Sequence, residues 1–164
     1  ILSTGMATVA EIKSAIKVIE KYHKKIIILY CVSGYPTKES EANIRTIRKF
    51  KSIFKNYVIG ISDHTNNIYS ALAATALGAS VIEKHFILNK KLNSLDKTFS
   101  IDAKQLKKLK VITSKIYSSL GKPIIGPKKN EISSLKLRRS VFAIKDINKG
   151  EKLTKYNIGK KKDE

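Results

Sequence analysis

The sequence predicts an α/β fold built on a parallel sheet. Short and almost entirely apolar runs alternate with amphipathic helical segments, in four units of roughly 20 to 30 residues. The apolar runs lack the alternation of a half-exposed strand, which is typical of strands buried on both faces. An open doubly wound sheet and a (β/α)8 barrel both fit this order. Four units are half of the eight that a barrel needs, and the chain starts inside a strand. We therefore expect the C-terminal half of a TIM barrel.

Start and stop signals bound the predicted helices. Thr8 is a typical helix cap, and Glu11 three positions later completes a capping box. Gly78 ends an Ala-rich helix in the manner of a C′ glycine. In order, the predicted elements are a strand end at 1–3, a helix after Thr8, a strand over 26–31, a helix over 44–54, a strand over 57–61, a helix over 68–77, a strand over 80–86 and a helix over 102–120.

The character of the chain changes near Gly121. Residues 121–135 contain two of the three prolines and two glycines, which indicates a linker. Residues 136–164 contain short apolar runs separated by turn residues, and they are too few for a core of any size. We therefore expect a barrel half over 1–120, a linker over 121–135 and the start of a small β-rich domain over 136–164.

The chain is strongly basic, with 33 Lys and Arg against 13 Asp and Glu and a formal net charge of +20. Such a charge suggests phosphate-rich partners, above all nucleic acid. The excess is nearly all lysine, however, and it is spread along the chain without an Arg-rich block. We favour a lysine-rich background over a nucleic-acid footprint, and a small anionic substrate would be attracted by the field in either case.

Two classes of protein are disfavoured by composition. The single cysteine, Cys31, excludes an intrachain disulfide and a Cys-rich zinc site, and it fits a reducing, cytoplasmic location. The longest apolar runs are too short to span a bilayer, so we expect no membrane partner.

Polar clusters follow all four predicted strands. Reactive groups of parallel α/β folds gather at the carboxyl edge of the sheet, where strands end and loops begin. The clusters that fall on this edge are Ser3–Met6, Cys31–Pro36, Ser62–Thr65 and Glu83–Phe86.

Two of the three histidines lie in these clusters. Side chains two positions apart on a strand share a face, so Ser62 points with His64 and Glu83 points with His85. If the isoleucines of strand 57–61 face the helices, neighbouring strands each present one histidine inward at the same height.

Two imidazoles with nearby oxygen groups can hold a divalent cation in an open site, where it acts as a Lewis acid on a carbonyl. With Glu83 beside them, Mn²⁺ or Mg²⁺ is favoured over a structural zinc. The alternative is that each histidine only bonds a loop backbone. Residues of the other polar segments also have two interpretations each. Ser3 can help to hold an anion or simply cap a helix, and Tyr35 can line a pocket or pack against its neighbours. Asp96 can bind a hydroxylated ligand or lie in a solvated loop.

Five motifs occur along the chain in the same order as in a known protein family: "ILSTGMATVAEI", "YCVSGYPT", "GISDHT", "ALGASVIEKHF" and "RRSVFAIKDINKGEKLT". Over essentially its whole length the chain thus resembles the N-acetylneuraminate (sialic acid) synthase family, which includes pseudaminic and legionaminic acid synthases. The resemblance implies the second half of that family's barrel, followed by the beginning of its antifreeze-like (SAF) domain.

The resemblance also implies an activity. Such enzymes condense phosphoenolpyruvate with an open-chain N-acylated aminosugar, such as N-acetylmannosamine, and release phosphate. A metal held by His64 and His85 would orient and polarise the sugar aldehyde during attack by the enol carbon. The family also implies a domain-swapped homodimer for the complete protein, and we expect the isolated chain to be inactive.

Single residues receive roles from the same resemblance. Ser3 and Ser62 look like contacts of phosphate or phosphoenolpyruvate, and Tyr35 and Asp96 look like contacts of the sugar. Glu83 looks like the acid/base or the partner of a metal-bound water, and with the two histidines it forms the implied catalytic set.

The chain departs from the family in several places. Ser33 stands where some members have an asparagine that contacts the sugar. The lysine and glutamate of the family's first barrel strands have no counterpart. Lys162 in "GKKKDE" replaces an arginine that reaches the partner's active site. "LDKTFSID", with Phe99 and Ser100, favours the pseudaminic and legionaminic branches. The alternatives left open are a basic nucleic-acid-binding module and an inactive relative retained for assembly.

Overall fold

The computed structural model describes residues 1–91 and 94–162, apart from the side chains of residues 161 and 162. It divides into two compact units, Ile1–Gly121 and Lys122–Glu164, each of which is described by itself below. Among the described residues, no helix is both long and apolar enough to cross a membrane.

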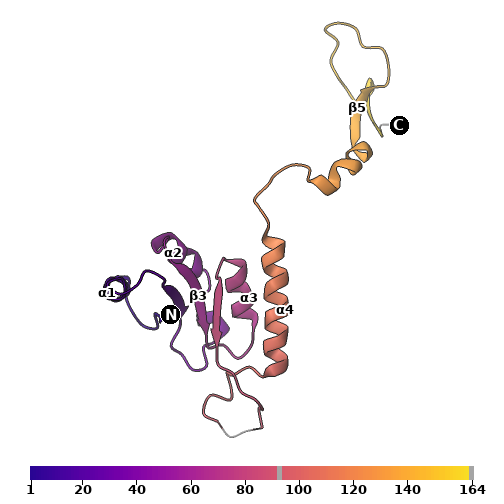
Figure 1. Cartoon of the computed structure of the whole chain (residues 1–164). Coiled ribbons are helices and arrows are strands. Elements are labelled where there is room, and N and C mark those ends of the chain that lie inside the picture. Colours follow the sequence, from indigo (N-terminus) through magenta and orange to yellow (C-terminus); the bar gives the residue numbers. More distant parts are fainter. Residues whose placement is uncertain (92–93, 163–164) are drawn as a thin grey trace. The chain divides into compact units, whose positions relative to one another are not determined.

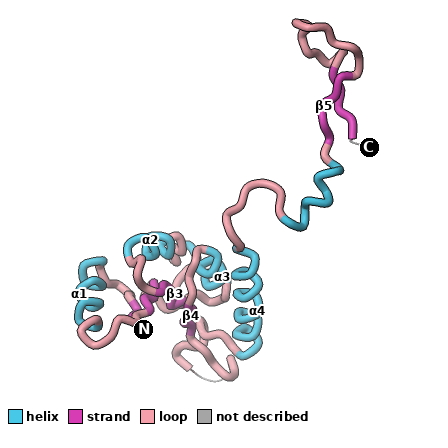
Figure 2. Tube along the Cα trace, turned by 45° about the horizontal axis from the view of Figure 1, so that its top comes forward, coloured by secondary structure: helices cyan, strands magenta, loops and turns pink. Residues whose placement is uncertain are grey.

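The first unit alternates strands and helices around one parallel sheet (Figures 1 and 2). The strands lie in the order β1-β2-β3-β4, so the predicted α/β fold with a parallel sheet is confirmed. The elements are β1 (Leu2–Ser3), α1 (Val9–Ile19), β2 (Ile27–Cys31), the short 3-10 helix η1 (Glu39–Glu41), α2 (Thr46–Ile53), β3 (Val58–Asp63), α3 (Tyr69–Ala76), β4 (Val81–Lys84) and α4 (Ala103–Leu120).

The capping signals of the sequence act as predicted. The Thr8 hydroxyl accepts from the backbone N–H of Glu11 at 3.3 Å, and the Glu11 carboxylate accepts from the backbone N–H of Thr8 at 2.7 Å. Asp102 and Gln105 form the same reciprocal pair at the start of α4. Gly78 follows α3 with a φ of +97°, a conformation that glycine adopts without steric cost.

Three predicted boundaries are wrong by a few residues. β3 continues to Asp63 because its last residues pair with β4, whereas α2 begins only at Thr46 after a turn of tighter i→i+3 bonds. β4 ends at Lys84 rather than at Phe86. Beyond it the backbone bonds the returning loop, since the Ile101 N–H donates to the His85 carbonyl at 2.8 Å.

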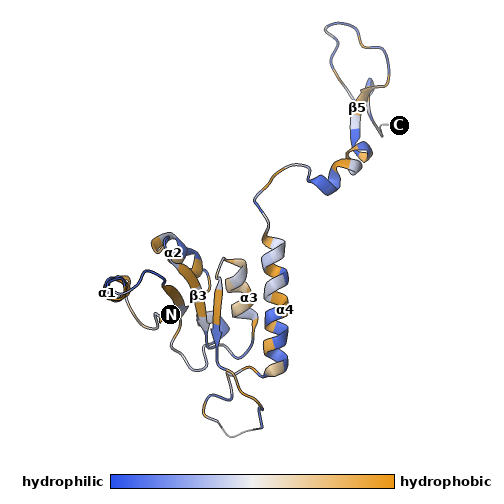
Figure 3. Cartoon of the chain, viewed as in Figure 1, coloured by the Kyte–Doolittle hydropathy of each residue, from blue (hydrophilic) through white to orange (hydrophobic). Residues whose placement is uncertain are grey.

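The core lies between the sheet and the first helices. Alternate residues of the central strands pack against α1 and α2, and Figure 3 shows the apolar colour of these strands against the more polar α4. The buried apolar members of this cluster are Ile12, Ile16, Ile26, Ile28, Ile47, Phe50, Phe54, Ile59, Ile61, Ala74 and Ala79. The predicted orientation of Ile59 and Ile61 toward the helices is therefore confirmed, which turns Ser62 to the opposite face.

Both outer strands of the sheet have an unpaired side. Among the described residues β1 pairs only with β2, and β4 pairs only with β3 within this sheet. The four βα units therefore form an open parallel sheet, and closing it into a barrel would require further strands.

In its described part, up to residue 162, the second unit contains one helix and two strands: η2 (Lys129–Leu137), β5 (Arg139–Ala143) and β6 (Ile158–Lys162), with β5 and β6 antiparallel. Part of the segment predicted as a linker, residues 121–135, belongs to η2, a 3-10 helix that starts at Lys129. Its first turn is closed by the Lys128 N–H, which donates to the Glu131 carboxylate at 2.7 Å. Asn157 is the one buried residue among those described here, in line with the expected lack of a core.

We predict that Gly60→Ala destabilises the sheet. A Cβ on Gly60 in β3 would lie 2.5 Å from the Val81 carbonyl oxygen and 2.6 Å from Leu29 Cδ2, and both neighbours belong to strands that pair with β3. The expected loss in the free energy of unfolding is about 1–3 kcal/mol, measured by urea unfolding. Gly34→Ala is the matched control, because the nearest atom to its added Cβ lies at 3.5 Å. Equal stability of the two variants would contradict the prediction.

Candidate active site

The register of the sheet brings the predicted polar clusters to one edge. Cys31 of β2 pairs with Ser62 of β3, which pairs with Glu83 of β4. His64 and His85 follow two residues beyond the last two of these, and their ring centroids lie 5.2 Å apart. The spacing therefore predicts correctly that the two histidines meet at neighbouring strand ends.

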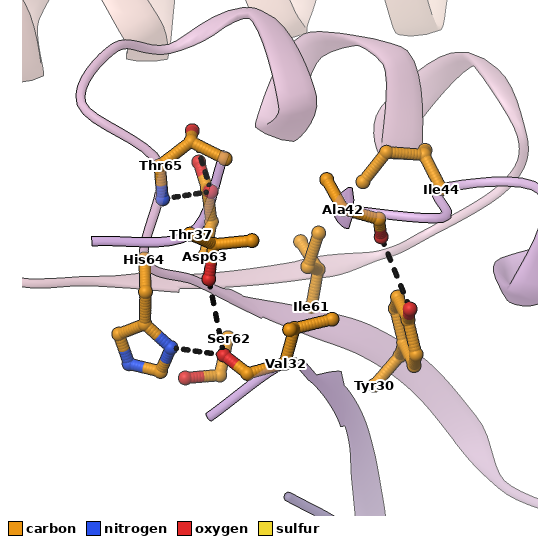
Figure 4. A pocket seen from close by; sticks show the side chains of 10 residues that line it. All are labelled: Tyr30, Val32, Thr37, Ala42, Ile44, Ile61, Ser62, Asp63, His64 and Thr65. Atoms are coloured by element: carbon orange, nitrogen blue, oxygen red, sulfur yellow. Dashed lines mark hydrogen bonds between the residues drawn. The ribbon is translucent and has the colours of Figure 1, made fainter. Parts of the chain in front are cut away.

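His64 is held in one orientation by the loop after β2. Its Nδ1 lies 3.0 Å from the carbonyl oxygen of Val32, as Figure 4 shows. A carbonyl only accepts, so Nδ1 carries the proton and Nε2 keeps its lone pair. The His64 carbonyl in turn accepts from the Thr37 N–H at 3.0 Å, and the whole residue is only 5% exposed.

A carboxylate bonds His85 through the same ring nitrogen, Nδ1, by which His64 is held. Its Nδ1 lies 3.2 Å from Asp96 Oδ2, so the proton of the neutral ring resides on Nδ1 and Nε2 is again available. Asp96 belongs to the loop between β4 and α4, where its backbone carbonyl accepts from both the hydroxyl and the N–H of Ser100. Carboxylate–histidine pairs of this kind orient metal ligands in proteins.

Two aromatic rings flank the imidazoles. The ring centroid of Tyr35 lies 4.2 Å from that of His64, and the centroid of Phe99 lies 4.8 Å from that of His85. The two aromatic rings also contact each other, with centroids 5.5 Å apart. Phe99 is buried, whereas Tyr35 is 55% exposed, so Tyr35 lines the surface of the site and Phe99 packs beneath it.

The remaining predicted residues lie around this centre. Ser62 is buried, on the same face of the sheet as the exposed Glu83 beside it. Ser33 Oγ lies 3.9 Å from the sulfur of Cys31, which in turn lies 3.9 Å from His64 Nδ1. Ser3 is exposed on β1, two strands away from Ser62. The structure thus brings His64, His85, Tyr35 and Asp96 into one cluster, with Ser33 at its border and Ser3 further along the edge.

The two imidazoles fit an open site for a divalent ion. An ion about 2.1 Å from one nitrogen of each ring would keep the centroids roughly 4.5–5.5 Å apart, and the observed 5.2 Å falls in this range. Within the described part of the chain, no group of three or more His, Cys, Asp or Glu residues could hold a metal.

A buried ion pair beside the histidines was missed by the sequence reasoning. Lys84 Nζ lies 3.0 Å from Asp63 Oδ2, and both side chains are almost completely buried. Burial lowers the pKa of the Lys84 ammonium, although the Asp63 carboxylate acts in the opposite direction. The available signal was a charged residue immediately before each histidine, at the ends of two apolar strands.

Known proteins are similar to this chain in sequence. Residues 1–124 match the NeuB family. The chain is 43% identical to a pseudaminic acid synthase of Helicobacter pylori, over 96% of its own length and 47% of the relative's. It is 39% identical to an N,N'-diacetyllegionaminic acid synthase of Campylobacter jejuni, over 99% of its length and 49% of the relative's.

A solved structure supports the same relationship. The N-acetylneuraminic acid synthetase of Leptospira borgpetersenii, crystallised with citrate, superposes with a TM-score of 0.75 at 36% identity, over 82% of this chain and 47% of that one. The chain thus spans about half the length of the relatives that it matches. By sequence and by fold, it belongs to the NeuB family.

Proposed function

We propose that this chain forms the metal-binding half of a nonulosonic acid synthase. The reaction would join phosphoenolpyruvate to an N-acetylmannosamine-like aminosugar and release phosphate. The observation that carries the proposal is the pair of imidazoles, each with Nδ1 engaged and Nε2 available, in a chain whose relatives are named pseudaminic and legionaminic acid synthases.

The architecture of the complete protein is part of the proposal. The four βα units would be the C-terminal half of a (β/α)8 barrel, and residues 136–164 would be the start of an SAF domain. The unpaired sides of β1 and β4 and the coverage of about half of each relative support this interpretation. We further propose a domain-swapped homodimer. In it, Lys162 would take the place of the family arginine that reaches the active site of the partner subunit.

The residues of this chain would prepare the sugar for attack. His64 and His85 would hold Mn²⁺ or Mg²⁺, which supplies Lewis-acid polarisation of the aldehyde oxygen when bound. Asp96 and the Val32 carbonyl fix the imidazole tautomers, so that in the neutral rings the lone pair is on Nε2. The exposed ring of Tyr35 offers a wall against which the sugar chain can lie.

The remaining roles concern phosphate and protons. Ser62 and Ser3 carry hydroxyl donors on the same sheet and are proposed contacts of phosphoenolpyruvate. A C–C bond would form between the enol carbon and the aldehyde carbon, water would add to the resulting cation, and phosphate would leave. Glu83, whose side chain shares a face with Ser62 and is open to solvent, is the proposed acid/base.

The acceptor is proposed to be a diacetamido sugar of the pseudaminic or legionaminic type. The names of the two relatives above support this choice, as does the "LDKTFSID" segment. Phe99 of that segment packs against His85, next to the place where the acceptor would bind.

We predict that His64→Ala and His85→Ala each abolish the reaction in the complete protein. Each change removes one of two metal ligands, so a loss of more than ~100-fold is expected, beyond the 10–100-fold attributed to outer-shell partners alone. The measurement is phosphate release from phosphoenolpyruvate with Mn²⁺ and a panel of acceptor sugars, with and without EDTA. Circular dichroism checks that the variants are folded.

His23→Ala is the matched control for this experiment, because His23 is exposed and lies outside the sheet edge. Its activity should equal that of the unmodified protein. Activity near the unmodified level in either His64→Ala or His85→Ala would refute the proposed metal site, as would full activity in the presence of EDTA.

Asp96→Asn is predicted to weaken metal binding without removing a ligand. An asparagine oxygen can still accept from His85 Nδ1, but the negative charge that raises the basicity of Nε2 is lost. We expect a 10–100-fold rise in the Kd for Mn²⁺, measured by calorimetric titration. Asp146→Asn removes an exposed carboxylate of the second unit and serves as the control. An unchanged Kd would show that Asp96 does not act through His85.

A further inference from the structure

A buried ion pair joins the two strands that carry the histidines. Asp63 ends β3 and immediately precedes His64, whereas Lys84 ends β4 and immediately precedes His85. The side chain of Lys84 is 2% exposed and that of Asp63 is 1% exposed. The other ion pairs of the described residues are far more open to solvent.

The ammonium of Lys84 also bonds the backbone on both sides of His64. Nζ lies 2.7 Å from the carbonyl oxygen of Thr65 and 3.3 Å from the carbonyl oxygen of Asp63. Together with Asp63 Oδ2 at 3.0 Å, these acceptors match the three hydrogens of the ammonium. A residue next to one histidine thus holds the peptide groups next to the other.

The second oxygen of Asp63 completes the network. Oδ1 accepts from the Thr65 N–H at 2.9 Å and from the Thr65 hydroxyl at 2.8 Å. Thr65 is itself only 1% exposed, so residues 63–65 form a turn that is fixed from inside the protein. Figure 4 shows this turn, with the His64 ring directed away from it toward Val32.

Stability alone does not explain this pair. Taking two charges out of water costs about as much as their attraction returns, and a well-packed apolar pair would stabilise the fold at least as well. What the pair adds is directional bonding between two strand ends. Lys84 binds three oxygens of the turn that contains His64. The position of His85 at the end of β4 is therefore coupled to that of His64 at the end of β3.

We propose that Asp63, Lys84 and Thr65 act as a positioning clamp that aligns His64 and His85 for metal binding. The inference rests on the proposed function for its metal, but the alignment itself is a property of this chain. The proposed action of the clamp residues is through the two histidines, so they are positioning residues rather than catalytic ones.

The decisive variant is the double change Asp63→Asn with Lys84→Met in the complete protein. It removes both charges, so no unpaired charge is left buried, and the asparagine oxygen can still accept from Thr65. We expect the double variant to be less destabilised in urea unfolding than Lys84→Met alone, together with an affinity for Mn²⁺ that is about 10-fold weaker or worse. Lys84→Met alone should lose both stability and affinity, because it leaves the Asp63 carboxylate unpaired.

A second readout does not depend on the metal. In protein labelled with ¹⁵N-histidine and free of metal, the Nδ1 signals of His64 and His85 report their bonds to Val32 and Asp96. We expect these signals to shift or broaden in the double variant. Lys51→Met is the matched control, since Lys51 Nζ also bonds a carbonyl, that of Gly78, but on the exposed surface away from the site.

The outcomes separate the inference from the proposed function. A double variant with unchanged Mn²⁺ affinity and unchanged histidine signals would overturn the clamp. If the unmodified protein binds no Mn²⁺, the proposed metal site fails, and the histidine signals alone then decide on the clamp. If the double variant does not fold, Thr65→Val replaces it, because it removes only the hydroxyl bonds, to Asp63 Oδ1 and the Asn67 carbonyl. Histidine signals and Mn²⁺ affinity unchanged in that variant would overturn the clamp as well.

Discussion

The in-register pairing of β2, β3 and β4 determines where the two histidines, Ser62 and Glu83 lie. Cys31, Ser62 and Glu83 form one row across the three strands, and side chains in one row of a parallel sheet share a face. The histidines come two residues later, so they inherit this alignment. The next row on this face consists of Leu29, Gly60 and Val81. It requires a glycine at position 60, because the space that a Cβ would occupy there is filled by Leu29 and Val81. Slipping the register by one residue would turn either histidine toward the helices.

Two different loops bond the two histidines, and the two imidazoles differ in their exposure to solvent. His64 is bonded by backbone groups of the loop after β2 and is buried. The side chain of His85 is 34% exposed, and its partner Asp96, which is 51% exposed, comes from the loop that precedes α4. The imidazole of His64 is buried and fixed by backbone bonds, whereas the carboxylate-bonded imidazole of His85 is partly open to solvent. The proposed metal site would combine one buried and one partly exposed histidine.

The sequence predicted the parts of this arrangement that follow from periodicity. Apolar runs predicted the strands, and polar residues after them predicted the shared edge at which His64 and His85 meet. The bond from His85 to Asp96 and the packing of Phe99 depend on the path of a loop of more than ten residues, which no periodicity encodes. The Asp63–Lys84 pair was missed for another reason. Charged residues are almost always solvent-exposed unless paired, and the pairing becomes visible only once the strands are aligned.

Two of the predicted residues outside the histidine cluster lie on the outer strands of the sheet. Ser3 belongs to β1 and Glu83 to β4, at opposite sides of the open sheet, and both are exposed. In a closed barrel the inner faces of all strands surround one interior, so residues far apart across an open sheet approach the same space. The roles proposed for Ser3 and Glu83 therefore depend on strands that would pair with the free sides of β1 and β4. The alignment of the histidines does not depend on such strands, because all the hydrogen bonds that hold His64 and His85 come from within this chain.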